Sequence, residues 1–225
     1  MVSQETVTKH EFCDNTKSEP DKMLKEITDI HLLEKLKQHQ VWVETTGLFG
    51  VQLWLEDADL SFLDLSGRNL SQAILPGTNL QGAALRKTDF YSANLASASF
   101  NKADLTMADL TKANLDYATL IGATLCDAKL FKASFYQVNM RGADLTHANL
   151  NHAYFNQANL ENVILKDAFL GDLTLTDVLF SGVIIHSEAN LESVKAKNVN
   201  IGTEENPVLL QDAAFRKWVL EQSEI

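Results

Sequence analysis

The sequence predicts an all-β solenoid whose coils have four short sides, with a helical segment at each end. Three observations predict it: a period of five residues, an unbroken array with that period, and a regular alternation of large and small residues. Residues 102–120, KADLTMADLTKANLDYATL, show the period directly, because Ala and Leu each recur at every fifth position. A helix repeats its apolar face about every 3.6 residues and a strand about every two, so neither explains this period.

The array contains 27 consecutive units, centred on residues 55 to 185, without insertion or deletion. The central residue is always Leu, Phe, Met or Ile, and Ala stands two positions before it in 17 of the 27 units. Such a pair would fill the axis of a narrow coil and let neighbouring turns of backbone approach. We therefore expect a structural core that includes Ala103, Leu105, Ala108, Leu110, Ala113, Leu115, Ala118 and Leu120.

The residue just before each centre is often Asp or Asn, as at Asp104, Asp109 and Asn114. These side chains tolerate turns and bond local backbone, so they suit the corners of a coil. Four units of five give twenty residues per coil, and neighbouring coils would pair at the β-spacing of about 4.8 Å.

The A-(D/N)-L-x-x pattern over residues 53–201 resembles the pentapeptide-repeat family. The resemblance implies a right-handed quadrilateral β-helix, here of about seven to eight coils and roughly 35 Å long. The stretch HQVWVETTGLFGVQL, with His39 and Trp42, is similar to the H-x-x-W leader that precedes the array in many bacterial members.

Four segments follow from these patterns: a mobile tail over 1–17, an N-terminal helical cap over 18–50, the repeat array over 51–202, and a C-terminal helical cap over 203–225. A solenoid needs caps because its exposed edges otherwise polymerise.

The N-terminal cap reads as one or two helices, with Pro20 near a start and Gly47 as a stop. Its expected apolar stripe, with Trp42 beside it, is Leu32, Leu33, Leu36 and Val43.

At the other end the register slips by one residue after Ile185. Asn206 then suits a helix N-cap and Pro207 the first helical position. Phe215 and Trp218 would contact the last coil or, in the alternative that the family resemblance raises, a second copy of the chain in a homodimer.

Net charge, cysteine spacing and the absence of long apolar runs in the sequence argue against several classes of function. The net charge of −11 argues against direct nucleic-acid binding. Cys13 and Cys126 lie far apart and show no metal or redox spacing, and no run is apolar enough for a signal peptide or membrane span. We therefore expect a soluble, reduced, cytoplasmic protein.

Residues twenty apart should stack, which places His147 between Asp127 and Asp167. This column could bind a metal or shift the histidine pKa, or it could be an ordinary ladder of mixed charge. Cys126 is expected to point outward between Thr106 and Thr146, with no activating base. We expect neither an enzyme nor a cofactor.

Four aromatic residues occupy outward positions on two adjoining sides, and large outward aromatics are typical anchors of protein interfaces. These candidate protein-binding residues are Tyr91, Tyr117, Phe131 and Tyr136. The alternative is that they are ordinary surface residues that favour strands.

The patterns favour a non-enzymatic interaction or scaffold protein whose protein partner the sequence does not identify. The alternative implied by the resemblance is a DNA mimic that modulates DNA gyrase and confers quinolone resistance. The acidic residues, however, are spread over the array and both caps, and none of the stacked columns is a continuous acidic stripe.

The register makes a direct prediction. Leu110→Asp places a charge in the packed axis and should lower the melting temperature by on the order of 10 °C or more. Thr111→Asp, one residue on but outward, should change the free energy of unfolding by only about 0.5 kcal/mol. If thermal melts found the two variants equally stable, the assignment of inward and outward positions would be wrong.

Overall fold

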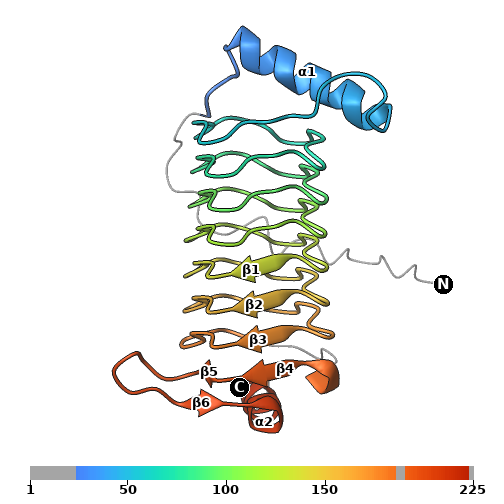
Figure 1. Ribbon diagram of the computed structural model, residues 1–225. Coiled ribbons are helices and arrows are strands. Elements are labelled where there is room, and N and C mark those ends of the chain that lie inside the picture. The colour runs from blue at the N-terminus through green and yellow to red at the C-terminus, as the bar shows by residue number, and fades with distance from the viewer. Residues whose placement is uncertain (1–23, 186–190, 223–225) are drawn as a thin grey trace, which may run out of the picture.

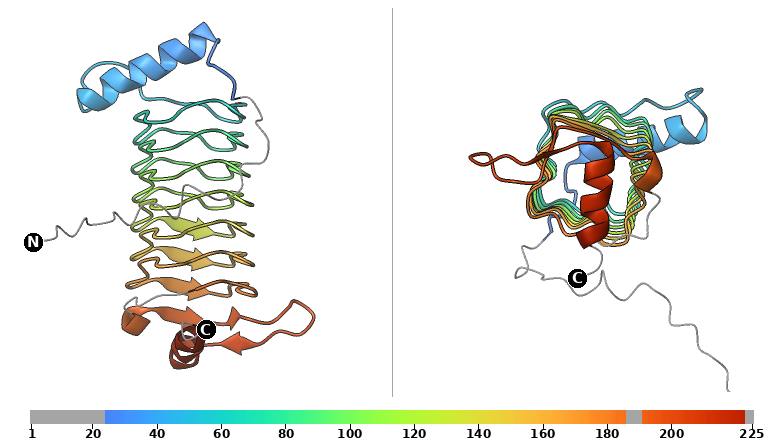
Figure 2. Two further views of the ribbon diagram at one scale, coloured as in Figure 1. Left: turned by 180° about the vertical axis from the view of Figure 1, so that it is seen from behind. Right: turned by 90° about the horizontal axis from the view of Figure 1, so that it is seen from below.

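The computed structural model describes residues 24–185 and 191–222, which form a stack of coils with a helix at each end (Figure 1). Viewed along the axis, the coils superimpose on a four-sided outline (Figure 2). Parallel bridges join residues twenty apart, from Trp54 with Ile74 to Ile164 with Ile184. The period of five therefore builds one side of a coil, and four units build one turn.

Backbone hydrogen bonds between coils define each side. In the unit centred on Leu110, the Leu110 N–H donates to the Lys129 carbonyl (2.7 Å), and the Asp109 N–H donates to the Thr88 carbonyl (2.9 Å). The corner is closed by Asp109, whose Oδ1 accepts the Thr111 N–H at 3.0 Å. The expectation that pre-centre Asp and Asn bond local backbone is confirmed here. Their expected place at the corners is wrong, because Asp109 pairs with Asp89 and Lys129 along the side and the turn is formed by Thr111 and Lys112.

The second residue after the centre adopts a left-handed backbone in most units. Lys112 has φ +59°, Tyr117 +63° and His147 +58°. This conformation costs a residue with a Cβ roughly 1–2 kcal/mol. It is offset because the same residue donates a bond to the next coil, as Lys112 N–H does to the Phe131 carbonyl at 2.9 Å.

The axis of the stack is filled by the centres and by the small residues two positions before them. Leu105, Leu110, Leu115 and Leu120 are fully buried, and Ala103, Ala108, Ala113 and Ala118 are at most 1% exposed. Phe135 and Phe155 stack at 4.4 Å between ring centroids, so consecutive coils interlock through their large residues.

On one side the pairing is regular enough to form strands. β1 (Ser134–Tyr136), β2 (Tyr154–Asn156), β3 (Thr174–Thr176) and β4 (Lys195–Lys197) make a parallel sheet in that order. Thr174 pairs with Lys195, an offset of 21 rather than 20. The predicted one-residue slip after Ile185 is thereby confirmed.

At the N-terminal end, α1 (Ile30–Glu44) lies across the first coil (Figure 1). The expected start near Pro20 lies outside the described residues. Residues 24–29 are not helical, because the Lys25 N–H donates to the Phe62 carbonyl (2.7 Å) and Asp29 caps the helix through the His31 N–H (2.8 Å). Of the expected stripe, Leu32 and Leu36 are buried, Leu33 is exposed and Val43 half-buried.

The H-x-x-W pair joins α1 to the array. His39 is fully buried, stacks on Trp42 at 5.8 Å between centroids, and accepts the Leu53 N–H on Nδ1 at 3.0 Å. Its Nε2 has no hydrogen-bond partner among the described residues. Burial lowers the pKa of His39, although the backbone of Ser71 opposes the shift. Burial and the N–H that Leu53 donates to Nδ1 favour the neutral imidazole.

At the C-terminal end, the short helix η1 (Leu191–Ser193) leads into β4. β5 (Val199–Asn200) and β6 (Leu209–Leu210) then form an antiparallel pair. The predicted helix start at Asn206 and Pro207 is wrong for this reason: Asn200 Oδ1 accepts the Val208 N–H (2.9 Å) and holds the chain extended.

The C-terminal helix, α2 (Asp212–Gln222), begins five residues later than Pro207. Phe215 is buried and meets Phe180 of the last coils edge-on at 5.4 Å. Trp218 also lies edge-on to Phe180, at 6.0 Å. Both residues therefore cover the open end of the core. Over the described ranges, neither helix is long and apolar enough to cross a membrane.

The environment of His39 makes stability pH-dependent. Because its folded pKa lies below the unfolded value of 6.5, the stability contributed by neutral His39 is complete above about pH 6.5 and is lost as the pH falls below it. His39→Gln keeps an acceptor for Leu53 but cannot become charged.

Urea unfolding between about pH 7.5 and 5.5 should show a shallower loss of stability for His39→Gln than for the wild type. The matched control is His31→Gln, since His31 is exposed on the same helix. Equal slopes for wild type and His39→Gln would contradict this role.

Candidate protein-interaction face

The side of the rod that carries β1 and β2 also carries three neighbouring tyrosines, and we call it the tyrosine face. Tyr136 belongs to β1, Tyr154 to β2, and Tyr117 to the turn one coil above β1. Tyr117 is 53% and Tyr154 40% exposed, whereas Tyr136 is half-buried between them in the sequence of coils.

Two of the tyrosines are in direct contact, and the third is linked to them through Asn156. Tyr117 and Tyr136 meet edge-to-face at 5.3 Å between ring centroids. Asn156, which pairs with Tyr136 across the sheet, donates from Nδ2 to the Tyr154 hydroxyl at 2.9 Å. An edge-to-face pair contributes about 0.5–1.5 kcal/mol beyond its buried area, so the rings hold one another in place.

Polar side chains brace the cluster from below and beside it. Asp116 accepts the Tyr136 N–H at 2.9 Å and the Ser134 hydroxyl at 2.6 Å on the same oxygen. Gln137 donates to Gln157 one coil on, at 2.6 Å. The face is therefore pre-organised: its backbone is fixed by strand pairing and its side chains by these bonds.

The charge of this side differs from that of the other three. Its outward positions from Trp54 to Asp177 hold four carboxylates and no Lys or Arg. Each of the other sides carries at least two basic residues, for example Lys102 and Arg141 on one of them. The tyrosine face is thus aromatic, polar and mildly acidic.

The other two aromatic candidates lie on a different side, beneath cations. Lys112 Nζ lies 5.2 Å from the Tyr91 ring centroid and donates to its hydroxyl at 2.8 Å, which lowers the pKa of Tyr91. Lys132 Nζ lies 5.1 Å from the Phe131 centroid, and His152 meets that ring edge-on. The structure therefore brings Tyr117 and Tyr136 together but not the four candidates.

Tyr154 is the member of the cluster that the sequence reasoning missed. It occupies the pre-centre position, which was read as a corner for Asp and Asn. The twenty-residue column provides the signal, because it stacks Tyr154 under Ser134, two residues from Tyr136.

The stacked histidine column is present as predicted. His147 Nδ1 lies 3.6 Å from Asp127 and its Nε2 lies 3.6 Å from Asp167. Within the described part of the chain, no three His, Cys, Asp or Glu side chains converge as metal ligands would. The column matches the mixed-charge ladder, and the next side shows the same pairing of His152 with Asp172 at 3.5 Å.

The expectation that Cys126 is exposed on a flat side is wrong: the residue holds an outward position in the register but is fully buried. Coils lie directly above and below it: Met107 N–H donates to the Cys126 carbonyl, and Asp127 N–H to the Thr146 carbonyl. A short side chain at this corner is enclosed between them, as the buried Thr106 and Thr146 also show.

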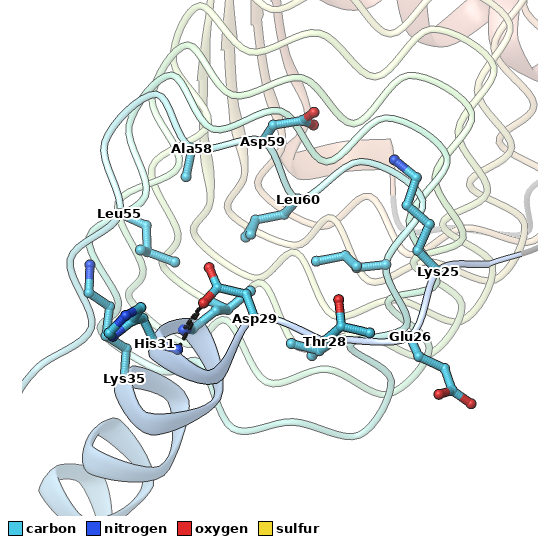
Figure 3. A pocket seen from close by; sticks show the side chains of 13 residues that line it. Lys25, Glu26, Thr28, Asp29, His31, Lys35, Leu55, Ala58, Asp59 and Leu60 are labelled. Carbon is cyan, nitrogen blue, oxygen red and sulfur yellow. Dashed lines mark hydrogen bonds between the residues drawn. The ribbon is translucent and has the colours of Figure 1, made fainter.

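A pocket of about 610 Å³ lies at the N-terminal end, between the start of α1 and the first coil (Figure 3). Its floor includes Leu55, Leu60 and Leu63, and its rim mixes cations such as Lys25 with carboxylates such as Asp59. The pocket marks where α1 leaves the core end incompletely covered, since Leu55 is the one unit centre that is only half-buried.

The pentapeptide-repeat family model matches this chain in eight copies, over residues 55–90, 88–125, 108–146 and 143–182. The matched segments span more than half of the chain and coincide with the stacked coils. No curated protein matches the sequence significantly.

Solved structures of pentapeptide repeat proteins are similar to this chain. One, from the thylakoid lumen of Arabidopsis thaliana, is 33% identical over 43% of this chain and 67% of its own, with a TM-score of 0.42. Another, involved in heterocyst differentiation regulation in the cyanobacterium Nostoc, is 25% identical over 64% and 86%, with a TM-score of 0.22. A plasmid-mediated fluoroquinolone resistance protein is 15% identical over 77% and 97%, with a TM-score of 0.41.

The burial of Cys126 predicts its reactivity. In a Cys13→Ser variant, a thiol reagent such as DTNB should label almost none of the native protein and about one thiol per chain after unfolding in guanidinium. Rapid stoichiometric labelling of the native variant would place Cys126 on the surface after all.

Proposed function

Because this chain belongs to the pentapeptide repeat family, we propose that it is a non-enzymatic scaffold that binds a protein partner through the tyrosine face. In this proposal the rod is a right-handed four-sided helix of seven to eight coils with helical caps. It requires no cofactor and does not bind nucleic acid directly.

The observation that supports the proposal is the cluster of Tyr117, Tyr136 and Tyr154 on a side whose outward positions from Trp54 to Asp177 hold no Lys or Arg. Tyrosine supplies a large contact area with a polar tip and loses little conformational entropy on binding. Because the rings are already ordered by the contacts described above, a partner need not order them.

The contacts of Phe215 and Trp218 support a cap at the C-terminal end. Both aromatic rings lie against Phe180 of the same chain, and Phe215 is buried there. We propose that these residues act within the monomer.

The ion pairs on the rod argue against the alternative function, a DNA mimic that modulates DNA gyrase. Lys129 pairs with Asp109 (3.1 Å) and Arg86 with Asp104 (3.0 Å), so carboxylates in these columns are neutralised by neighbours. A mimic of DNA requires closely spaced uncompensated negative charge.

The test of the proposal compares two variants in quantitative affinity capture from an extract of the source cells. Tyr117→Ala/Tyr136→Ala/Tyr154→Ala should lose, at least tenfold, a partner that the wild type retains. Tyr91→Ala/Phe131→Ala is the matched control, and it should retain the partner.

Equal capture by both variants would contradict the tyrosine face as the interface. The same protein should leave gyrase supercoiling unchanged at micromolar concentration, with or without a fluoroquinolone. Inhibition, or protection from the drug, would replace the scaffold with the mimic.

A further inference from the structure

A second surface lies at the N-terminal end, where the chain leaves α1 and enters the first coil. Four large apolar side chains are exposed within seven residues: Leu48 (77%), Phe49 (69%), Val51 (64%) and Trp54 (61%). We call them the leader surface. Clusters of this kind mark interaction sites in folded proteins, because such residues otherwise lower solubility.

The leader surface is held rigidly. The Thr45 hydroxyl donates to the Val41 carbonyl at 2.7 Å and accepts the Phe49 N–H at 3.0 Å. The Val51 N–H donates to the Gln38 carbonyl at 3.2 Å. Between them Gly50 has φ +77°, and a side chain there would collide with the backbone of Gln38 and Trp42. The backbone that carries Leu48, Phe49 and Val51 is thus held in one arrangement.

The surroundings of the leader surface are acidic. Residues 38–67 contain five carboxylates, Glu44, Glu56, Asp57, Asp59 and Asp64, and no Lys or Arg. All five are exposed, but the charges of Lys25 and Arg68 act on Asp59 and Asp64. The other three, Glu44, Glu56 and Asp57, lie within four residues of an exposed apolar side chain in the sequence. Apolar anchors bordered by negative charge are complementary to a segment that is apolar on one face and basic beside it.

The same carboxylates disfavour two other binding partners of an apolar surface: a second copy of the chain and an anionic membrane. In a symmetric pair of chains this surface would meet its own copy, so the carboxylates would face one another. Anionic lipid head groups would likewise be repelled, since membrane-binding loops use Lys and Arg around their apolar residues.

We propose that the leader surface binds a basic amphipathic segment of a partner protein. Leu48, Phe49, Val51 and Trp54 contact its apolar face, and Glu44, Glu56 and Asp57 pair with its Lys and Arg residues. This site lies at the N-terminal end of the side that carries the tyrosines: Asp57 lies three coils above Tyr117 in the same column, roughly 14 Å away at about 4.8 Å per coil, and Trp54 five coils above Tyr154.

The test is fluorescence anisotropy of the full chain with a labelled peptide of about 18 residues, composed of Leu and Lys and amphipathic as a helix. Wild type should bind at micromolar concentrations. Phe49→Ser/Val51→Ser should weaken binding at least tenfold, and Glu56→Gln/Asp57→Asn several-fold. Two control variants should bind like wild type: Phe169→Ser, whose exposed ring lies at the far end of the rod, and Tyr136→Ala on the tyrosine face.

Two further peptides check the chemistry. A scrambled peptide of the same composition and a peptide with Glu in place of Lys should both bind at least tenfold more weakly. The proposal is overturned if the amphipathic peptide does not bind, if the other peptides bind equally well, or if Phe49→Ser/Val51→Ser binds like wild type.

Sedimentation velocity and vesicle flotation test the other occupants. Wild type should sediment as a monomer and stay unbound to phosphatidylcholine and phosphatidylglycerol vesicles. Self-association abolished by Phe49→Ser/Val51→Ser would assign the surface to a second copy. Flotation abolished by the same change would assign it to a membrane, and either result overturns the proposal.

Discussion

The hydrogen bonds between successive coils are the constraint on which the rest of this molecule depends. Each side donates and accepts through fixed positions, such as Leu110 to Lys129 and Asn114 to Ala93, so the chain must return to the same side after twenty residues. Every side-chain column follows from that return. The stacking ends where this return is broken. Between Thr174 and Lys195 the offset becomes 21, and after β4 the chain forms β5, β6 and α2 instead of further regular coils.

The same constraint determines how such a rod can carry a function. The centre and the residue two before it are used by the core, so each side offers few outward positions per coil. Residues far apart in sequence but twenty apart in register become neighbours, as Gln137 and Gln157 do. A surface patch on the rod is therefore built from residues of successive coils, not from residues adjacent in sequence. The tyrosine face arises because aromatic residues of three consecutive coils fall on one side, and because the basic residues of the regular coils before β4 fall on the other sides.

The period of five was enough to predict the array, its core and the stacking of His147 between Asp127 and Asp167, because each depends only on register. The period was not enough to predict features that depend on which local hydrogen bonds form or on how neighbouring coils enclose a side chain. Asn206 and Pro207 resemble a helix start, but the side chain of Asn200 captures Val208 and delays the helix to Asp212. Cys126 occupies an outward position by register, yet the coils above and below enclose it. The left-handed backbone of Met107, Tyr117 and His147 has no signal in these residues themselves; the signal is the Gly at the same position of other units, such as Gly122 and Gly142.

The most direct test of this account measures how far the rod rises over many residues. Ser97 and Asp177 are exposed, share one column with Tyr117, and are separated by four coils. In a Cys13→Ser background, where Cys126 is buried, nitroxide labels at Ser97→Cys and Asp177→Cys can be measured by double electron–electron resonance. The account predicts a single narrow distance of roughly 20 Å, which is four steps of about 4.8 Å. A distribution centred beyond about 30 Å would contradict the stacking, and with it both proposed surfaces.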